Sequence, residues 1–285
     1  MQLRIILFNI LIVFFLLVTA FFPVSFLGAD LSAEFWRSVW PFMAVVLLAL
    51  GGVDIYFLLN RKFFNLLEKG EWKELAAYLS EKIYKQGKYS SRNVRFLAQS
   101  CLLLGDLAAI SELEQKTEEK KPSLVNENVL IFGIARILTV GASDGKTIAS
   151  NHASEFFGKI MAREKQGRLP NSEWVSWFYG FSLVFAKAFN SAGEVFSKLA
   201  ADAKNPIVTG LSAFFLLQVM GQNPQLAGEI FTKANDGKQR VKNSLKTSDK
   251  WRKKAEHLKA EVHGAIVGKY LDEASVWLFE EGDKK

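Results

Sequence analysis

The chain has 285 residues, a formal net charge of +7 and a single cysteine. One cysteine excludes an internal disulfide and a multi-thiolate metal site, and it fits a reducing compartment. Residues 1–59 hold two basic and three acidic residues, so their charge is −1 and the remainder carries +8.

The N-terminal part contains two long apolar runs, residues 5–27 and 39–59, with no Lys or Arg inside either. About 20 mostly apolar helical residues suffice to cross the ~30 Å hydrocarbon core of a bilayer. We therefore predict a membrane anchor over residues 1–62, with two transmembrane helices at about 5–27 and 40–59. Residues 28–39 are predicted to form a short loop, and Pro41 suits the first turn of the second helix.

The flanking charges predict the orientation, because cationic residues are retained on the cytoplasmic side of a membrane. Arg4 precedes the first run, and Arg61, Lys62 and Lys69 follow the second. The prediction is a multi-pass protein of a bacterial inner membrane, with residues 61–285 in the cytoplasm. Alternatively, the first run is a cleaved signal peptide with a small-residue site near Ala20, which leaves the location of residues 61–285 unchanged.

Asp54 lies inside the second run, six residues before Asn60 at its basic end. A carboxylate inside a membrane span is costly, and such acids are candidates for function. Two interpretations are open. Either Asp54, about 9 Å from the helix end, faces the first span, is protonated or reaches interfacial water, or it contacts a partner membrane protein.

Beyond residue 60, apolar residues recur at helical spacing in segments of about 12–20 residues, without the alternation typical of strands. Gly, Pro and Asn interrupt these segments, as they do where one helix ends and the next begins. The predicted fold class is all-α. The main interruptions are at Gly70, Gly87, Gly105, Pro122, Gly141, Gly167, Pro206 and Gly221.

Two patterns recur at intervals of 35–39 residues, which indicates internal repetition. One is a small residue, then Phe four positions later, then an apolar or small residue three positions after that. The other is Gly, an acidic residue and an apolar residue, at Gly70-Glu71-Trp72 and again at Gly105-Asp106-Leu107. The first pattern occurs at Ala153, Phe157 and Ile160, at Ala192, Phe196 and Leu199, and at Ala227, Phe231 and Ala234.

These residues resemble the tetratricopeptide repeat, although no copy carries the whole signature of that family. The resemblance covers about residues 61–237 in four to five helix pairs, with an insertion around residues 141–146. It implies a TPR-like α-solenoid over residues 63–237, closed by basic capping helices over residues 238–285. An unrelated helical bundle is the alternative, because generic helix packing also places Ala and Phe at this spacing.

No motif predicts catalysis. The segment from Gly141 to Thr147 has three residues before its Gly-Lys-Thr where a phosphate-binding loop needs four, so it is interpreted as a connection between helices. His152, His257 and His263 are too scattered for a metal pair. We predict a protein that is not an enzyme and has no cofactor and no metal.

Three surfaces are candidates for binding. The aromatic stripe between Trp174 and Phe185 is interpreted as core, with a peptide groove as the alternative. Arg92, Arg95 and Arg136 fall on helices that would line the groove, where they could pair with acidic groups of a partner protein.

Near an anionic leaflet a basic cluster gains ~1 kcal/mol per residue, so the basic C-terminal segment could bind anionic lipid or, equally, an acidic protein. That segment comprises Lys238, Arg240, Lys242, Lys246, Lys250, Arg252, Lys253 and Lys254. Nucleic acid is not expected, because no recognition motif accompanies the charge.

The sequence thus favours a membrane-anchored cytoplasmic scaffold that binds other proteins through its helical repeats. By analogy, such a protein is an accessory part of a bacterial envelope machine such as a flagellar motor or a secretion system. The alternative is a regulatory subunit of a membrane transporter or enzyme, which it contacts through its spans at Asp54.

Overall fold

The computed structural model describes residues 11–15, 17–19, 21, 28–142, 147–164, 172–222, 227–259, 261 and 264–279. Every regular element in these ranges is a helix, and none is a strand. The prediction of an all-α protein is therefore confirmed for the described chain. Two compact units are present, Met1–Tyr78 and Leu79–Lys285, and each is described by itself.

The first unit is built on α2, Gly28–Leu59, followed by α3, Arg61–Lys69. Helix α4, Trp72–Ser80, starts in this unit, crosses its boundary and continues as the π-helical turn η1, Glu81–Lys85. Within α2, Phe35–Leu59 is long and apolar enough to cross a membrane. No residue of its apolar 18-residue stretch is buried by the rest of the protein. Leu48 is 77% exposed and Leu59 76% exposed.

The predicted start of this span was wrong. Residues 28–39 were expected to form a loop, but they are the first turns of α2, and Pro41 lies inside the helix. The segment 28–39 contains Ala29, Leu31, Ala33 and Glu34, which are good helix formers, and a proline inside an apolar membrane helix is tolerated. The first predicted span, residues 5–27, lies largely outside the described residues, so one helix of spanning length is established.

The end of α2 is fixed by an aromatic cluster. Asn60 is buried and donates from Nδ2 to the carbonyl of Tyr56 at 2.8 Å. The rings of Phe57 and Phe64 are 4.9 Å apart, which packs the start of α3 against the last turn of α2. Arg61 and Lys62 remain exposed beside this cluster.

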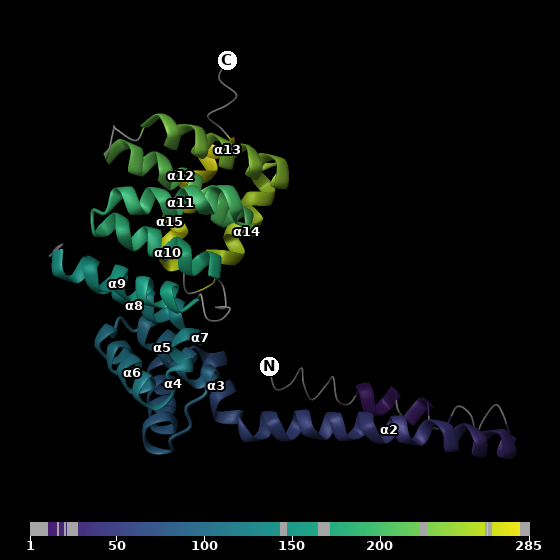
Figure 1. The fold of residues 1–285 in the computed structure, drawn as a ribbon. Coiled ribbons are helices and arrows are strands. Elements are labelled where there is room, and N and C mark those ends of the chain that lie inside the picture. The colour runs from purple at the N-terminus through teal and green to yellow at the C-terminus, as the bar shows by residue number, and fades with distance from the viewer. Residues whose placement is uncertain are drawn as a thin grey trace. The chain divides into compact units, whose positions relative to one another are not determined.

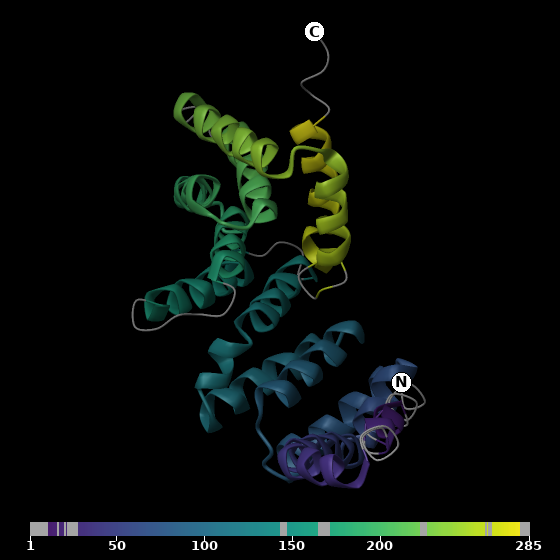
Figure 2. The same ribbon diagram turned by 90° about the vertical axis from the view of Figure 1, so that its right-hand side faces the viewer.

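The second unit holds eleven α-helices among its described residues, and consecutive helices pack against one another (Figure 1). Helix α10 contacts α8 on one side and α12 on the other in one layer, and α11 and α13 contact each other in a second layer. Helices α14 and α15 pack against each other, and both contact α12 and α13 (Figure 2). The bounds are α5 Ser91–Leu103, α6 Leu107–Lys120, α7 Ser123–Glu127, α8 Val129–Ala142, α9 Thr147–Glu164, α10 Ser172–Phe185, α11 Phe189–Asp202, α12 Pro206–Gln222, α13 Ala227–Leu245, α14 Ser248–Lys259 and α15 Gly264–Phe279.

The same tight turn joins helices at three places. Gly70 and Gly105 both adopt left-handed backbone angles, with φ of 68° and 71°. In each turn the glycine N–H donates to the carbonyl three residues back and the next N–H donates to the carbonyl five residues back, as in a Schellman motif. Lys187 repeats this geometry with φ of 59°, although its sequence is Lys-Ala rather than Gly-acidic.

The Lys187 turn generates a testable prediction. A left-handed backbone costs an L-residue roughly 1–2 kcal/mol, part of which glycine avoids. We expect Lys187→Gly to raise the free energy of unfolding by about 0.5–1 kcal/mol, measured by urea denaturation followed through tryptophan fluorescence. Lys198→Gly, at an exposed site inside α11, is the control and should lower it by about 1 kcal/mol. Destabilisation by both substitutions would contradict this account of the turn.

Glycines allow helices in the second unit to approach closely. A Cβ atom on Gly133 of α8 would collide with the ring of Phe157 of α9, and one on Gly180 of α10 would lie 3.0 Å from the ring of Phe196 of α11. Both rings are fully buried. Phe231 of α13 is the phenylalanine of the repeated pattern that starts at Ala227. It differs from the other two, because it is 53% exposed. There the close contact is instead between Gly237 of α13 and Ala213 of α12.

This packing predicts that Gly180→Ala is destabilising even though alanine is the better helix former. The added methyl group overpacks the Phe196 contact, which typically costs about 1–3 kcal/mol. Gly228→Ala is a matched control, because a Cβ at this helical position meets nothing within 4 Å. Its stability should be unchanged or slightly raised. Equal effects of the two substitutions on the urea midpoint would show that Gly180 is not under steric constraint.

Candidate functional site

The three arginines predicted to bind a partner are not equivalent. Arg92 and Arg95 lie on α5, where Arg95 is exposed and Arg92 is half-buried. Arg136 lies on α8, and its guanidinium group is held by two neighbouring helices. The structure therefore singles out Arg136.

Glu114 of α6 holds Arg136 in a two-point ion pair. Nε of Arg136 lies 3.1 Å from Oε2 of Glu114, and Nη2 lies 2.9 Å from Oε1. The Glu114 side chain is only 7% exposed, whereas that of Arg136 is 37% exposed. A planar guanidinium bound in this way has a fixed orientation, because both hydrogen bonds must be satisfied together.

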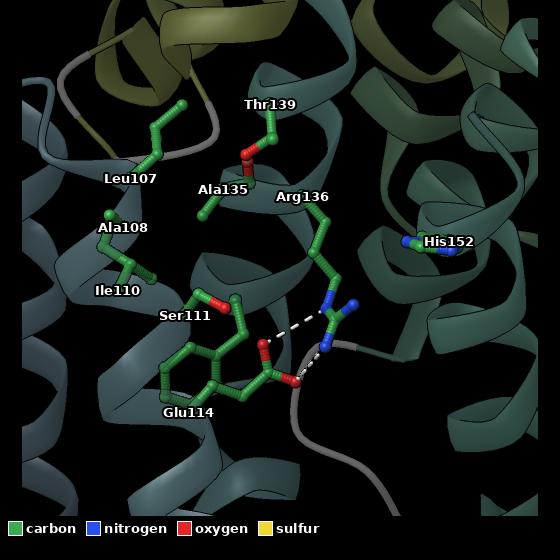
Figure 3. A pocket seen from close by; sticks show the side chains of 10 residues that line it. Leu107, Ala108, Ile110, Ser111, Glu114, Ala135, Arg136, Thr139 and His152 are labelled. Carbon is green, nitrogen blue, oxygen red and sulfur yellow. Dashed lines mark hydrogen bonds and ion pairs between the residues drawn. The ribbon is translucent and has the colours of Figure 1, made fainter. Parts of the chain in front are cut away.

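Phe156 of α9 supports Arg136 from another side. The guanidinium carbon lies 4.9 Å from the centre of the Phe156 ring, a cation–π contact. Within the described residues no hydrogen bond is made by Nη1 of Arg136, and Figure 3 shows that this nitrogen points away from Glu114. One edge of the guanidinium is therefore both fixed and available to a ligand.

Two hollows adjoin this edge, and we call them together the Arg136 cleft. The first has a volume of about 330 Å³ and lies between α6, α8 and α9 (Figure 3). The second, of about 300 Å³, is more polar and shares Glu114, Arg136 and His152 with the first. The first is lined mainly by Leu107, Ile110, Ser111, Ala135 and Thr139, and the second by Val125, Glu155, Phe156, Lys159 and Ile160.

Sequence reasoning missed Glu114 and Phe156, although Glu114 left a signal. The buried residues of α6 are Ile110, Leu113, Glu114 and Thr117, so this glutamate lies on the apolar stripe of its helix. A carboxylate on such a stripe needs a cationic partner, because an unpaired buried charge is costly. The partner itself, 22 residues away, is not indicated by any local pattern.

The ion pair generates a prediction for stability. Removing only the cation in Arg136→Met leaves the Glu114 carboxylate buried and unpaired, which we expect to cost about 2–4 kcal/mol. The double variant Glu114→Leu/Arg136→Met replaces both charges by apolar groups and should recover most of that loss. The measurement is urea unfolding of the single and double variants. A double variant as unstable as Arg136→Met would refute the proposed pairing.

The aromatic stripe of α10 is core from Trp174 to Phe181, as its primary interpretation predicted, whereas Phe185 at its end is 44% exposed. Trp177 and Phe178 are fully buried, and Phe181 is 3% exposed. Helix α15 covers this side, because Tyr270 lies 5.8 Å from Phe181 and 4.9 Å from Phe215 of α12, measured between ring centres. The alternative of a peptide groove along this stripe is therefore closed by the chain's own last helix.

Two members of the basic C-terminal segment make structural contacts. Lys238 of α13 donates to the carbonyl of Trp277 at 2.6 Å, and its ammonium group lies 4.8 Å from the Trp277 ring centre. Arg240 donates to the carbonyls of Ala200 and Ala203 at 2.5 and 3.1 Å. These carbonyls end α11, where a cation also interacts favourably with the helix dipole.

The remaining polar candidates show no catalytic arrangement in the part of the chain that is described. Burial raises the pKa of the Cys101 thiol to about 11, and Asp106 adds to this shift, so the thiol is a poor nucleophile. No group of three or more His, Cys, Asp or Glu side chains is arranged to hold a metal ion in the described ranges. The segment around Gly141 connects α8 and α9, and residues 143–146 lie outside those ranges.

These observations define the class of the protein as an all-helical chain with an N-terminal helix of membrane-spanning length. The chain belongs to the family described as "Uncharacterised Treponema protein", which matches residues 109–280. That range runs from α6 to α15 and includes the Arg136 cleft residues Glu114, Arg136 and Phe156. A relative from Treponema pallidum (strain Nichols), described as "Uncharacterized protein", is 22% identical over 254 residues, covering 86% of this chain and 77% of the relative.

Proposed function

We propose that this protein is a membrane-anchored scaffold that binds another protein at the Arg136 cleft. The fixed, open guanidinium edge is the observation that carries the proposal. Arg136 is oriented by Glu114 and Phe156, so little conformational entropy is lost when Nη1 binds a ligand. A ligand that presents a carboxylate fits this edge, because a guanidinium recognises carboxylates by directed hydrogen bonds.

The charges around the cleft narrow the kind of segment it would accept. Lys159 and Arg136 supply positive charge in the second hollow, and Glu114, Glu118 and Glu155 supply negative charge. Val125 and Ile160 supply apolar wall. The segment best matched to these groups is a short peptide that carries an acidic residue, with an apolar and a basic residue close to it.

We propose further that α2 anchors the protein in a bacterial inner membrane with residues 61–285 in the cytoplasm. The exposed apolar side chains of α2 suit lipid, and Arg61, Lys62 and Lys69 of the following helix α3 favour the cytoplasmic side. A second span over residues 5–27 is part of this proposal. An envelope machine is the assembly in which we place such a scaffold, by analogy with other membrane-tethered helical-repeat proteins.

A TPR-like solenoid is the arrangement we propose for the helix pairs. The recurrence of one turn at Gly70 and Gly105 supports it, and so does the Gly–Phe packing of Gly180 with Phe196. The exposed Phe231 and the crossing of α14 and α15 are departures from a regular array.

Site-specific photo-crosslinking in native membranes tests the scaffold function. A photo-reactive residue replaces Glu155 at the cleft rim, and the same residue replaces Lys198, which is exposed on α11, as the control. We expect a discrete adduct with one protein from position 155 only, and we expect Lys159→Glu to reduce it at least several-fold.

Replacing α2 by an unrelated apolar helix separates this function from the alternative of a regulatory subunit. The adduct at position 155 should survive the replacement, because the cleft alone provides the contact. Its loss would assign the interaction to the span that carries Asp54. Equal labelling from positions 155 and 198 would refute the cleft as the binding site.

A further inference from the structure

Some basic residues of the C-terminal segment already bind other groups of the protein. The remaining positive charge is concentrated on one side of α14. Lys238 and Arg240 bind backbone carbonyls, as described above. Lys259 lies 3.0 Å from Asp272 of α15. Lys250, Lys253 and Lys254 are all exposed, and within the described residues no carboxylate lies within ion-pair distance of them. We call these three residues the lysine stripe.

Helical spacing places the lysine stripe beside the acidic residues of α14, on the solvent side of the helix. The helix docks through Trp251, Ala255 and Leu258, which are buried. Positions 250, 253 and 254 are related by three and four residues, so they neighbour one another along one side. Asp249 and Glu256 lie four residues before and three residues after Lys253, so they border the stripe along one edge, where Nη1 of Arg252 lies 3.7 Å from Oδ1 of Asp249.

Two more lysines extend the stripe towards α13. Lys246 occupies the left-handed turn that joins α13 to α14, with φ of 64°, and its side chain is exposed. Lys242 lies one helical turn earlier and is half-buried. Five lysines thus fall within 13 residues of chain, with Asp249 as the one acidic residue among them.

We propose that the lysine stripe, with Lys242 and Lys246, binds the anionic headgroups of the membrane that α2 crosses. This inference rests on α2 being the anchor proposed above. Headgroup phosphates need only exposed point charges, which lysine ammonium groups supply. Tethering by α2 keeps the stripe near the bilayer at high effective concentration, so weak contacts suffice.

An acidic protein fits the stripe less well. Stable protein interfaces are centred on buried aromatic or apolar anchors. The side of α14 that carries the stripe offers none, because Trp251 and Leu258 are turned into the core. The residues three or four positions after the stripe lysines on that side are other lysines or His257. The surface they form is therefore polar.

The test uses the full chain in nanodiscs of phosphatidylcholine, with or without phosphatidylglycerol, and measures the labelling rate of each lysine by mass spectrometry. Lys250, Lys253 and Lys254 should be labelled at least threefold more slowly in the anionic discs. Lys187 and Lys198, exposed elsewhere, should not change. The protection should disappear at 1 M salt, where the screening length falls to about 3 Å.

A charge variant provides a second readout. In Lys250→Gln/Lys253→Gln/Lys254→Gln, Lys242 and Lys246 should be labelled equally fast in both kinds of disc. The matched variant Lys187→Gln/Lys198→Gln/Lys204→Gln should keep their protection. A loss of protection in the matched variant would show that general charge, rather than the stripe, is responsible.

The other outcomes overturn the proposal in distinguishable ways. A chain that leaves the discs would overturn both the anchor and the lipid contact. A chain that stays in the discs but shows equal stripe labelling in both lipids would overturn the lipid contact alone. Slowing by added polyglutamate, without slowing by anionic lipid, would assign the stripe to an acidic protein partner.

Discussion

Close approach between helices is the constraint on which the second unit depends, and it is met by small residues placed opposite aromatic rings. Gly180 admits the ring of Phe196, and Gly210 of α12 admits Trp251 of α14, whose ring would lie 2.6 Å from an added Cβ. The ring of one helix fills the space beside a glycine of its neighbour. Each helix of the second unit therefore needs a neighbouring helix to bury its apolar side. Protein interiors pack at crystal density, so such contacts tolerate little added volume.

Polar side chains secure the same stack at its connections. Both carboxylate oxygens of Glu173, at the start of α10, accept backbone N–H groups of Lys204 and Asn205 at 2.8 and 3.0 Å. Arg240 binds the carbonyls of Ala200 and Ala203 just before them. In the link between α11 and α12, the Glu173 carboxylate therefore binds N–H groups that lack a partner within a helix. The Arg240 guanidinium binds carbonyls that lack one at the end of α11, and the helix dipole favours both contacts. The Glu114–Arg136 pair uses similar chemistry with side chains, and it leaves one edge of the cation unused.

Local patterns in the sequence predicted the helices, and contacts between distant residues account for what it did not predict. Gly70 and Gly105 were identified as breaks because glycine favours the left-handed angle that ends a helix. The equivalent turn at Lys187 was missed, since lysine does not indicate that angle and only the surrounding packing imposes it. Phe231 matched the repeat pattern, yet it is exposed, and the close contact of α13 with α12 is made by Gly237 against Ala213. Arg136 was selected as a binding residue, but its partner Glu114 is on another helix, and spacing along the chain carries no information about that pair.

Because α15 covers α10 and α12, it affects the order in which the domain folds and α2 inserts into a bilayer during synthesis. Val267, Leu271 and Leu278 of α15 have no exposed surface, so the aromatic layer beneath them is complete only after α15 has been added. Synthesis proceeds from the N-terminus, and segments generally fold as they emerge. Helix α2 therefore leaves the ribosome long before the domain can close. Any insertion of that helix into a bilayer would precede final folding, and the nascent domain would mature next to the lipid surface rather than arrive there already folded.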